Sequence, residues 1–228
     1  MKENRAGAMD KQLNTNNLLR FSHVDAKIHH KKSNYQGFFK LDEYQLSHKL
    51  FSGAMSEVIT REIFERGDAV VMMPYDPKSD KVLLLEQFRP GAIREQTTPW
   101  LLEFVAGMFA PDERPADVAI REAYEEAGLH ISPDKLLPIM KYFSSPGGMT
   151  EYIHLYVGLI DINEETHDPN NLNVFGLVEE GEDILLHVVS RIEAMELLEQ
   201  GKTVAILERE AVAWGASGRN GGLVSPGW

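Results

Sequence analysis

Short runs of apolar and β-branched residues recur along the chain, and they predict many strands and few helices. From Tyr35 onward, GFFKLDEYQLSHKLF and SEVITREIFERG mix apolar with polar positions in rough alternation, which is typical of strands with one buried face. AVVMMPY and KVLLLEQF flank the turn DPKSDK and predict a hairpin of two buried strands. Further strands are predicted at WLLEFVAG, YIHLYVGLI and ILLHVV, with another that ends near Lys141.

Two segments carry helix signals instead. Pro115 suits a first helical position, Asp117 lies where the helix dipole favours an acid, and Gly128 ends the periodic pattern. Ser190 and Glu193 have the spacing of a capping box, which predicts a second helix over EAMELLEQ. The order of elements therefore predicts an α/β fold with a mixed sheet and helices on its faces. The strands before the hairpin predict a small separate antiparallel sheet.

The first helix has an unusual charge pattern. At about 100° per residue, Glu122, Glu125 and Glu126 fall within an arc of roughly 100°, with small and apolar residues opposite. Like charges at this spacing repel, so these carboxylates need cations or raised pKa values. Hard oxygen ligands suit Mg²⁺ or Mn²⁺ better than zinc, and the chain has no cysteine. For the helix alone, an acidic solvated surface is the commoner explanation.

Composition narrows the class of protein. The 228 residues fit one large domain or a domain with a small extension, and 43% hydrophobic with 25% charged residues is typical of a globular protein. The net charge of −12 disfavours a nucleic-acid partner, but it allows a phosphorylated substrate because bound metal inverts the local field. A polar N-terminus, no cysteine and no 18-residue apolar run predict no membrane partner and a cytoplasmic location.

The residues around the acidic helix complete a known signature. Gly107, five residues, Glu113, seven residues and then REAYEEAGL resemble, position by position, the signature of the Nudix hydrolases. That resemblance implies a Nudix α/β/α sandwich in which this segment binds divalent metal beneath a nucleoside diphosphate linked to another group. Beyond the signature, EQFRPGAI, TPWLLEFVAGM and EEGEDILLHVVSR are similar to the bacterial ADP-ribose pyrophosphatases, with a match over roughly residues 35–203.

The narrower resemblance implies an activity and an assembly. The reaction would be hydrolysis of ADP-ribose to AMP and ribose 5-phosphate with Mg²⁺, or with Mn²⁺ as a substitute. The protein would be a homodimer that exchanges its N-terminal sheet, so that each sheet helps form the partner's site. Two alternatives stay open: a Nudix enzyme for another nucleotide sugar such as GDP-mannose, and a non-catalytic nucleotide- or flavin-binding protein. The complete set of glutamates argues against the second alternative.

The same resemblance implies roles for individual residues. The metal ligands would be the Ala106 carbonyl, Glu122, Glu126 and Glu182, with Glu125 bound through water. The general base would be Glu180, although the adjacent Glu179 leaves that assignment open by one position, and a solvated acidic loop is the plain alternative. Arg121, one turn from Glu125, would orient the glutamates.

Substrate contacts are expected at five positions, for each of which a structural role is nearly as plausible. Arg89 would pair with a phosphate or the terminal ribose. Phe38 and Arg61 would clamp the adenine from the partner subunit, and Ser145 and Glu151 would hold the terminal ribose.

The chain is expected to divide into four parts. These are a flexible N-terminus (1–20), a β-sheet and dimerisation region (21–66), a Nudix domain (67–214) and a flexible glycine-rich tail (215–228). After Thr203 the sequence departs from the family, and VAILEREAVAWGASGRNGG resembles part of the flavin-dependent amino-acid and amine oxidoreductases, with Glu208 at the cofactor ribose. No strand followed by GxGxxG precedes it, so flavin binding is not expected. A divergent terminal helix and a fusion or frameshift product are the alternatives.

Overall fold

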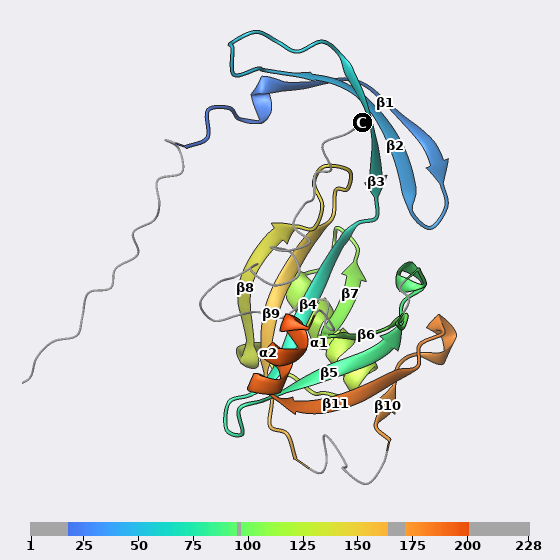
Figure 1. Ribbon diagram of the computed structural model, residues 1–228, viewed down its shortest axis with the longest axis vertical. Coiled ribbons are helices and arrows are strands. Elements are labelled where there is room, and N and C mark those ends of the chain that lie inside the picture. Colours follow the sequence, from blue (N-terminus) through green and yellow to red (C-terminus); the bar gives the residue numbers. More distant parts are fainter. Residues whose placement is uncertain (1–17, 95–96, 164–171, 201–228) are drawn as a thin grey trace, which may run out of the picture. The chain divides into compact units, whose positions relative to one another are not determined.

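The structure is a computed structural model, and it describes residues 18–94, 97–163 and 172–200 (Figure 1). The expectations for most of the N-terminus and for the flavin-like tail fall outside the described residues. The chain divides into two compact units, residues 1–63 and 64–228. Within the described ranges, every helix is too short or too polar to cross a membrane.

The N-terminal unit contains an antiparallel sheet. In the described residues its strands follow the order β1-β2-β3, with bounds Ala26–Gln36, Lys40–His48 and Ile59–Glu65. Every residue of β1 is exposed, and its sequence AKIHHKKSNYQ is polar. The pattern of the sequence indicated strands only from Tyr35 and therefore missed β1. A strand without a buried face lacks the alternation that marks a strand in the sequence.

The second unit holds a larger mixed sheet and two α-helices within the described residues. Its strands are β4 (Asp68–Asp76), β5 (Lys81–Phe88), β6 (Trp100–Glu103), β7 (Val105–Phe109), β8 (Leu136–Phe143), β9 (Tyr152–Leu159), β10 (Val174–Phe175) and β11 (Ile184–Ser190). The order is β10-β11-β5-β4-β9-β8, with β6 beside β5 and β7 beside β4. Strands β4 and β9 run parallel, whereas β8 and β9 run antiparallel. This mixed sheet confirms the predicted fold class.

The sheet splits where β4 and β5 diverge. These strands pair only next to their connecting turn, at Tyr75 with Val82 and at Asp76 with Lys81. Farther from the turn, β5 pairs with β6 and β4 pairs with β7, both antiparallel. The buried Phe104 is the residue that connects β6 to β7. The run WLLEFVAG had predicted one strand. The structure breaks it in two because each half pairs with a different branch of the sheet.

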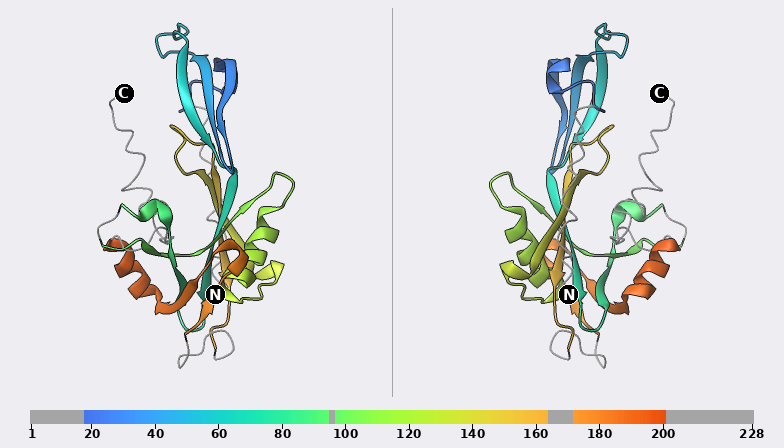
Figure 2. Two further views of the ribbon diagram at one scale, coloured as in Figure 1. Left: turned by 90° about the vertical axis from the view of Figure 1, so that its right-hand side faces the viewer. Right: turned by 90° about the vertical axis from the view of Figure 1, so that its left-hand side faces the viewer.

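The helices α1 (Pro115–Ala127) and α2 (Arg191–Glu199) cover opposite faces of the sheet, as Figure 2 shows. Leu83 and Leu85 of β5 belong to the core that includes α1, whereas Val82 and Leu84 belong to the core that includes Ala194 of α2. Successive residues of a strand point to opposite sides, so one strand supplies both cores. The result is the predicted α/β/α layering.

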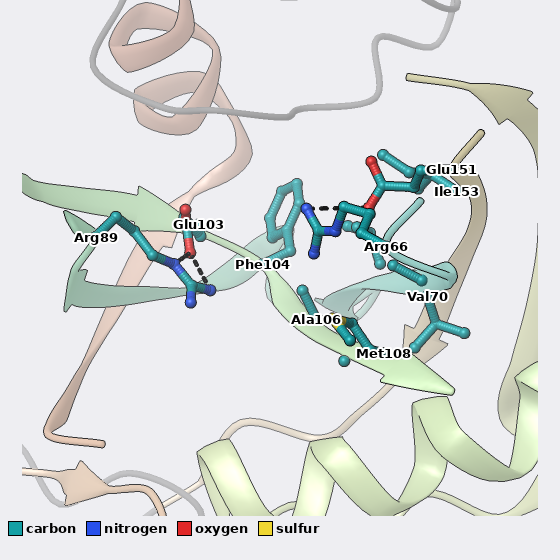
Figure 3. Close-up of a pocket in the computed structure, with 12 residues that line it drawn as sticks. Arg66, Val70, Arg89, Glu103, Phe104, Ala106, Met108, Glu151 and Ile153 are labelled. Carbon is teal, nitrogen blue, oxygen red and sulfur yellow. Dashed lines mark hydrogen bonds and ion pairs between the residues drawn. The ribbon is translucent and has the colours of Figure 1, made fainter. Parts of the chain in front are cut away.

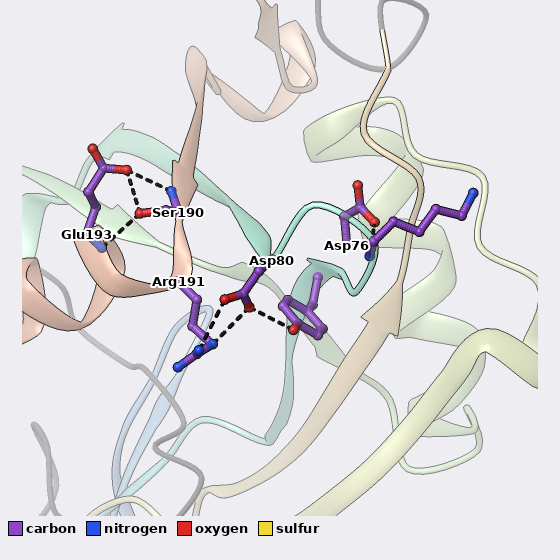
Figure 4. A network of polar contacts seen from close by, with 7 residues as sticks. Asp76, Asp80, Ser190, Arg191 and Glu193 are labelled. Atoms are coloured by element: carbon purple, nitrogen blue, oxygen red, sulfur yellow. Dashed lines mark hydrogen bonds and ion pairs between the residues drawn. The ribbon is translucent and has the colours of Figure 1, made fainter.

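Polar contacts fix the start of α2. The Ser190 hydroxyl accepts the Glu193 N–H at 3.1 Å, and the Glu193 carboxylate accepts the Ser190 N–H at 2.8 Å, which confirms the predicted capping box. Arg191 donates two hydrogen bonds to Asp80 in the β4–β5 turn, at 2.9 and 3.1 Å (Figure 4). Tyr75 donates a third to the same carboxylate at 2.9 Å. The turn and α2 are therefore joined at one end of β5 and β11.

Candidate active site

Helix α1 forms where the sequence signals predicted it. Pro115 is its first residue, and Gly128 follows it in the left-handed conformation, with φ 65°. The Gly128 N–H donates to the Tyr124 carbonyl and the Leu129 N–H to the Ala123 carbonyl, both at 2.9 Å. These bonds satisfy carbonyls at the end of the helix, which explains why a glycine ends it.

The placement of Glu126 corrects one expectation. We expected Glu122, Glu125 and Glu126 together on a face of α1 turned away from the core, but Glu126 is only 2% exposed. Its Oε2 accepts the Ala106 N–H of β7 at 2.9 Å, so a backbone donor stabilises the buried carboxylate. Burial raises the pKa of Glu126 to about 8, although the Ala106 N–H opposes the shift. Periodicity alone did not reveal that β7 offers this donor.

Glu122 lies directly over Gly107. A Cβ atom on Gly107 would be 2.1 Å from Oε1 of Glu122, so the glycine of the signature leaves the space that this carboxylate fills. Arg121 Nη2 lies 3.0 Å from the same oxygen, and Nη1 lies 2.9 Å from Glu125 Oε2. Burial raises the pKa of Glu122 to about 7; Arg121 opposes this shift and neighbouring carboxylates add to it. Arg121 thus contacts Glu122 and Glu125 of the helix.

The loop between β10 and β11 brings further carboxylates toward α1. Oε2 of Glu182 accepts the Leu177 N–H at 3.0 Å. Glu179 and Glu180 are both exposed at the end of the short 3₁₀ helix η5 (Val178–Glu180). Burial is the largest cause of the raised pKa of Glu122, and the charges of Glu182 and Glu180 add to it. Because Glu179 and Glu180 are both exposed, their burial does not indicate which one is the base. Substitution of each residue in turn is needed to decide.

Carboxylate oxygens are suitable ligands for a divalent cation, but these carboxylates do not converge on a single metal position. Among residues 18–94, 97–163 and 172–200, no three His, Asp or Glu side chains converge as a ligand cluster. Arg121 holds Glu122 and Glu125, and backbone N–H groups hold Glu126 and Glu182. Burial raises the pKa values of Glu122 and Glu126 and so disfavours their charged forms. A cation bound beside these carboxylates would lower both pKa values, because its positive charge stabilises the charged forms.

A cavity of about 390 Å³ lies at the split in the sheet. Figure 3 shows Arg89 facing Glu103 on one side of it, where Nη2 and Oε2 are 2.7 Å apart. On the other side, Arg66 Nη1 lies 3.2 Å from Oε1 of the buried Glu151. Ala106 also lines the cavity, and its N–H reaches the acid cluster of α1. Two arginines in a concave site beside acids suit a phosphorylated ligand that binds together with metal.

Not every predicted substrate residue lies at this cavity. Arg89 and Glu151 line it, whereas Ser145 is an exposed turn residue whose carbonyl accepts the N–H groups of the two residues Gly148 and Met149. Phe38 and Arg61 are exposed and belong to the N-terminal unit, residues 1–63, whereas the residues that line the cavity belong to the second unit.

Two charged residues of the cavity, Arg66 and Glu103, were not predicted. Arg66 directly follows the last residue of β3, just as Arg89 directly follows the last residue of β5. A glycine or proline comes next in both cases, and this shared pattern is the sequence signal that could have identified Arg66. Glu103 looked like a single polar residue within the apolar run WLLEF. Its partner Arg89 became evident only from the pairing of β5 with β6.

A comparison with family models decides the family. A model described as NUDIX domain matches residues 65–199, which is more than half of the chain and includes α1, the loop acids and the cavity. The chain belongs to the NUDIX family. A second model, described as FAD dependent oxidoreductase, matches residues 193–228 of this NUDIX protein. That match agrees with the flavin-like sequence of the tail, most of which lies outside the described residues.

Named relatives of this NUDIX protein cover most of its length. The ADP-ribose pyrophosphatase of Escherichia coli (strain K12) is 43% identical over 194 residues, which are 85% of this chain and 89% of the relative. That of Haemophilus influenzae is 42% identical over 185 residues, or 80% and 82% of the two chains. The GDP-mannose pyrophosphatase of Yersinia pestis is 29% identical over 174 residues, or 76% and 85%.

A solved structure supports the same fold. The crystal structure of an ADP compounds hydrolase superposes with a TM-score of 0.54 at 20% identity, and it covers 77% of this chain and 83% of that one. At this level of identity the likeness concerns the fold, and it agrees with the layered arrangement seen here.

Proposed function

We propose that this NUDIX protein hydrolyses ADP-ribose to AMP and ribose 5-phosphate in the cytoplasm, with Mg²⁺ or, as a substitute, Mn²⁺. The observation that carries the proposal is that Glu122 lies against Gly107 and Glu126 accepts the Ala106 N–H, while both of these β7 residues line a cavity that also holds two arginines. The relatives at 42–43% identity bear the name of this activity. Phosphoanhydride hydrolysis needs charge neutralisation, a positioned water and a base, and the site offers residues for each.

The cation would be held by residues of α1, β7 and the loop, namely the Ala106 carbonyl, Glu122, Glu126, Glu182 and, through water, Glu125. When bound, it would neutralise charge on the two phosphates and lower the pKa of water. Hard carboxylate and carbonyl oxygens are the donors that Mg²⁺ and Mn²⁺ prefer. Oε2 of Glu126 and of Glu182 already accepts a backbone N–H, and such bonds hold a ligand in a fixed orientation.

The remaining steps belong to side chains of the chain itself. Glu180, exposed on the loop, accepts a proton from the attacking water. Arg89 and Arg66 bind phosphate oxygens or the terminal ribose, and their carboxylate partners Glu103 and Glu151 fix the direction of the guanidinium groups. Because the base lies on an exposed loop, substrate binding can complete the site and restrain wasteful hydrolysis.

The proposed assembly is a homodimer with shared active sites. Phe38 is 87% exposed at the β1–β2 connection, and Arg61 is exposed on β3. An aromatic ring and a guanidinium group are both suited to stacking on adenine. In the proposed dimer, these residues of one subunit clamp the adenine bound by its partner.

A substrate panel tests the proposed activity. Purified protein with Mg²⁺ is given ADP-ribose, GDP-mannose, UDP-glucose, NADH and diadenosine polyphosphates, and the products are identified by chromatography and ³¹P NMR. We expect ADP-ribose to have the highest kcat/KM, about tenfold or more above GDP-mannose, with AMP and ribose 5-phosphate as products. GDP-mannose is the second candidate because of the Yersinia pestis relative. A preference for GDP-mannose, or no hydrolysis of any substrate, would refute the proposal.

A further inference from the structure

Residues 175–177 connect the β10–β11 loop to the end of α1. The Gly176 N–H donates to the Glu125 carbonyl at 3.2 Å. Carbonyls in the last turn of a helix lack donors within the helix, so the loop supplies one from another part of the chain. Glu125 follows Glu122 by nearly one helical turn and directly precedes the buried Glu126. The contact therefore attaches the loop at the acid cluster itself.

The ring of Phe175 makes a second attachment. It packs against the main hydrophobic core, and its Cε1 lies 2.5 Å from where a Cβ atom on Gly128 would be. Phe175 also pairs with Ile184 in the β10–β11 ladder. The glycine after α1 therefore has a second role, because it allows the ring to approach the helix end.

The same segment holds the carboxylate of Glu182. The Leu177 N–H donates to Oε2 of Glu182 at 3.0 Å, and the Glu182 N–H donates to the Leu177 carbonyl at 3.1 Å. Gly176 has φ +106°, and a Cβ atom there would lie 2.7 Å from Cβ of Glu182. Only glycine permits both this conformation and this close approach.

Farther along the loop, Val178, Glu179 and Glu180 are exposed. The loop is thus fixed at residues 175–177 and at Glu182, while the segment between them faces solvent. This arrangement places one carboxylate rigidly and presents another on an exposed turn.

We propose that residues 175–177 form a latch that sets the position of Glu182 against α1, and that Gly176 is the positioning residue of this latch. The inference rests on the proposed metal-dependent hydrolysis, and it adds a residue that acts through Glu182 without touching substrate. The latch fixes Glu182 relative to Glu122 and Glu126 before any ligand binds. It thereby determines how well the loop and helix carboxylates share one cation.

The first test compares two glycine variants. Gly176→Ala and Gly53→Ala both place a Cβ atom on left-handed backbone, with φ +106° and +95°, but Gly53 has no atom within 4 Å of the added carbon. We expect Gly176→Ala to weaken Mn²⁺ binding, measured by EPR with the metal alone, and to lower kcat by about 10- to 100-fold. KM for ADP-ribose should change little, and added Mn²⁺ should restore part of the rate. Gly53→Ala should match the wild type in Mn²⁺ affinity.

A second pair of variants decides the question if Gly176→Ala does not fold. Phe175→Ala removes the ring from Gly128, whereas Val174→Ala changes the half-exposed neighbour in the same strand β10. We expect faster hydrogen exchange at the Gly176, Leu177 and Glu182 amides and weaker Mn²⁺ binding in Phe175→Ala only. Thermal unfolding of both variants shows how much of any change reflects global stability.

The latch is overturned if folded Gly176→Ala or Phe175→Ala binds Mn²⁺ as tightly as its control and exchanges these amides at the same rate. Failure of the proposed function has a different signature. If the wild type does not hydrolyse ADP-ribose, the substrate assignment is wrong, while Mn²⁺ affinity and hydrogen exchange still decide the latch.

Discussion

Gly107→Ala tests whether Glu122 must occupy its observed place. The added Cβ would lie 2.1 Å from Oε1, 2.3 Å from Cδ and 2.4 Å from Cγ of Glu122. Ordinary van der Waals contact begins at 3.4 Å, so Oε1 must move away by 3.4 − 2.1 = 1.3 Å. Because Cγ and Cδ are crowded together with Oε1, Glu122 must turn its whole side chain from Cγ outward, which carries the carboxylate away from its observed place.

A displacement of this size should affect catalysis more than folding. A misplacement of about 1 Å in a catalytic site costs about 10²-fold in rate. Rearrangement of one side chain to admit a methyl group typically costs about 1–3 kcal/mol of unfolding free energy. We therefore expect Gly107→Ala to lose about 10²-fold in kcat on ADP-ribose and to require more Mg²⁺, while its unfolding temperature falls by about 2–12 °C and it stays folded at the assay temperature.

The assay measures kcat against Mg²⁺ concentration, together with thermal unfolding, and Gly91→Ala is the matched control. Gly91 lies in the same unit, in the 3₁₀ helix η3 (Pro90–Ala92), and an added Cβ would have no atom within 4 Å. It should keep wild-type turnover. Wild-type kcat and Mg²⁺ dependence in a folded Gly107→Ala would refute the argument that the carboxylate of Glu122 must lie over this glycine.

Three further predictions concern regions away from Glu122. Burial raises the pKa of Asp76, but hydrogen bonds from the Ser79 hydroxyl and the Lys78 N–H lower it by more, so that the pKa lies below the ordinary value of 3.8. Asp76→Asn should therefore cost about 1–3 kcal/mol near pH 7, and urea unfolding should show this gap closing as the pH falls below 3.8; a constant gap would contradict the assignment. Deletion of residues 1–55 should abolish ADP-ribose hydrolysis although α1 is intact, and a folded, monomeric, fully active product would exclude shared sites. Deletion of residues 215–228 should leave kcat nearly unchanged, because this segment has no carboxylate; a collapse of kcat in a still dimeric protein would give the tail a role in the site.

Local sequence signals were sufficient where the cause was itself local. Pro115 and Gly128 bounded α1, and Ser190 with Glu193 capped α2, because such contacts join residues a few positions apart. The continuous apolar run in KVLLLEQF likewise located β5, whose two faces meet different helices. The spacing along one helix also explains why Glu122 and Glu125 are neighbours that share Arg121.

The remaining features depend on contacts between distant segments. Burial of Glu126 requires the N–H of Ala106, 20 residues away, and no helical periodicity reveals that donor. The cavity requires the divergence of β4 from β5, which also splits WLLEFVAG and brings Arg89 to Glu103. The polar strand β1 has no buried face, so its pattern resembled a loop.

The central claim is that the helix and loop carboxylates hold a cation while Glu180 acts as the base. The most direct test is the rate of ADP-ribose hydrolysis against Mg²⁺ concentration for the Glu→Gln variants of Glu122, Glu126, Glu182, Glu180 and Glu179. The account predicts that the variants at 122, 126 and 182 need more Mg²⁺ and recover part of their rate when it is supplied. Glu180→Gln should keep wild-type Mg²⁺ and substrate affinity but lose about 10²-fold or more in kcat. A large loss in Glu179→Gln alone would move the base by one residue, whereas normal hydrolysis by both Glu179→Gln and Glu180→Gln would contradict the account.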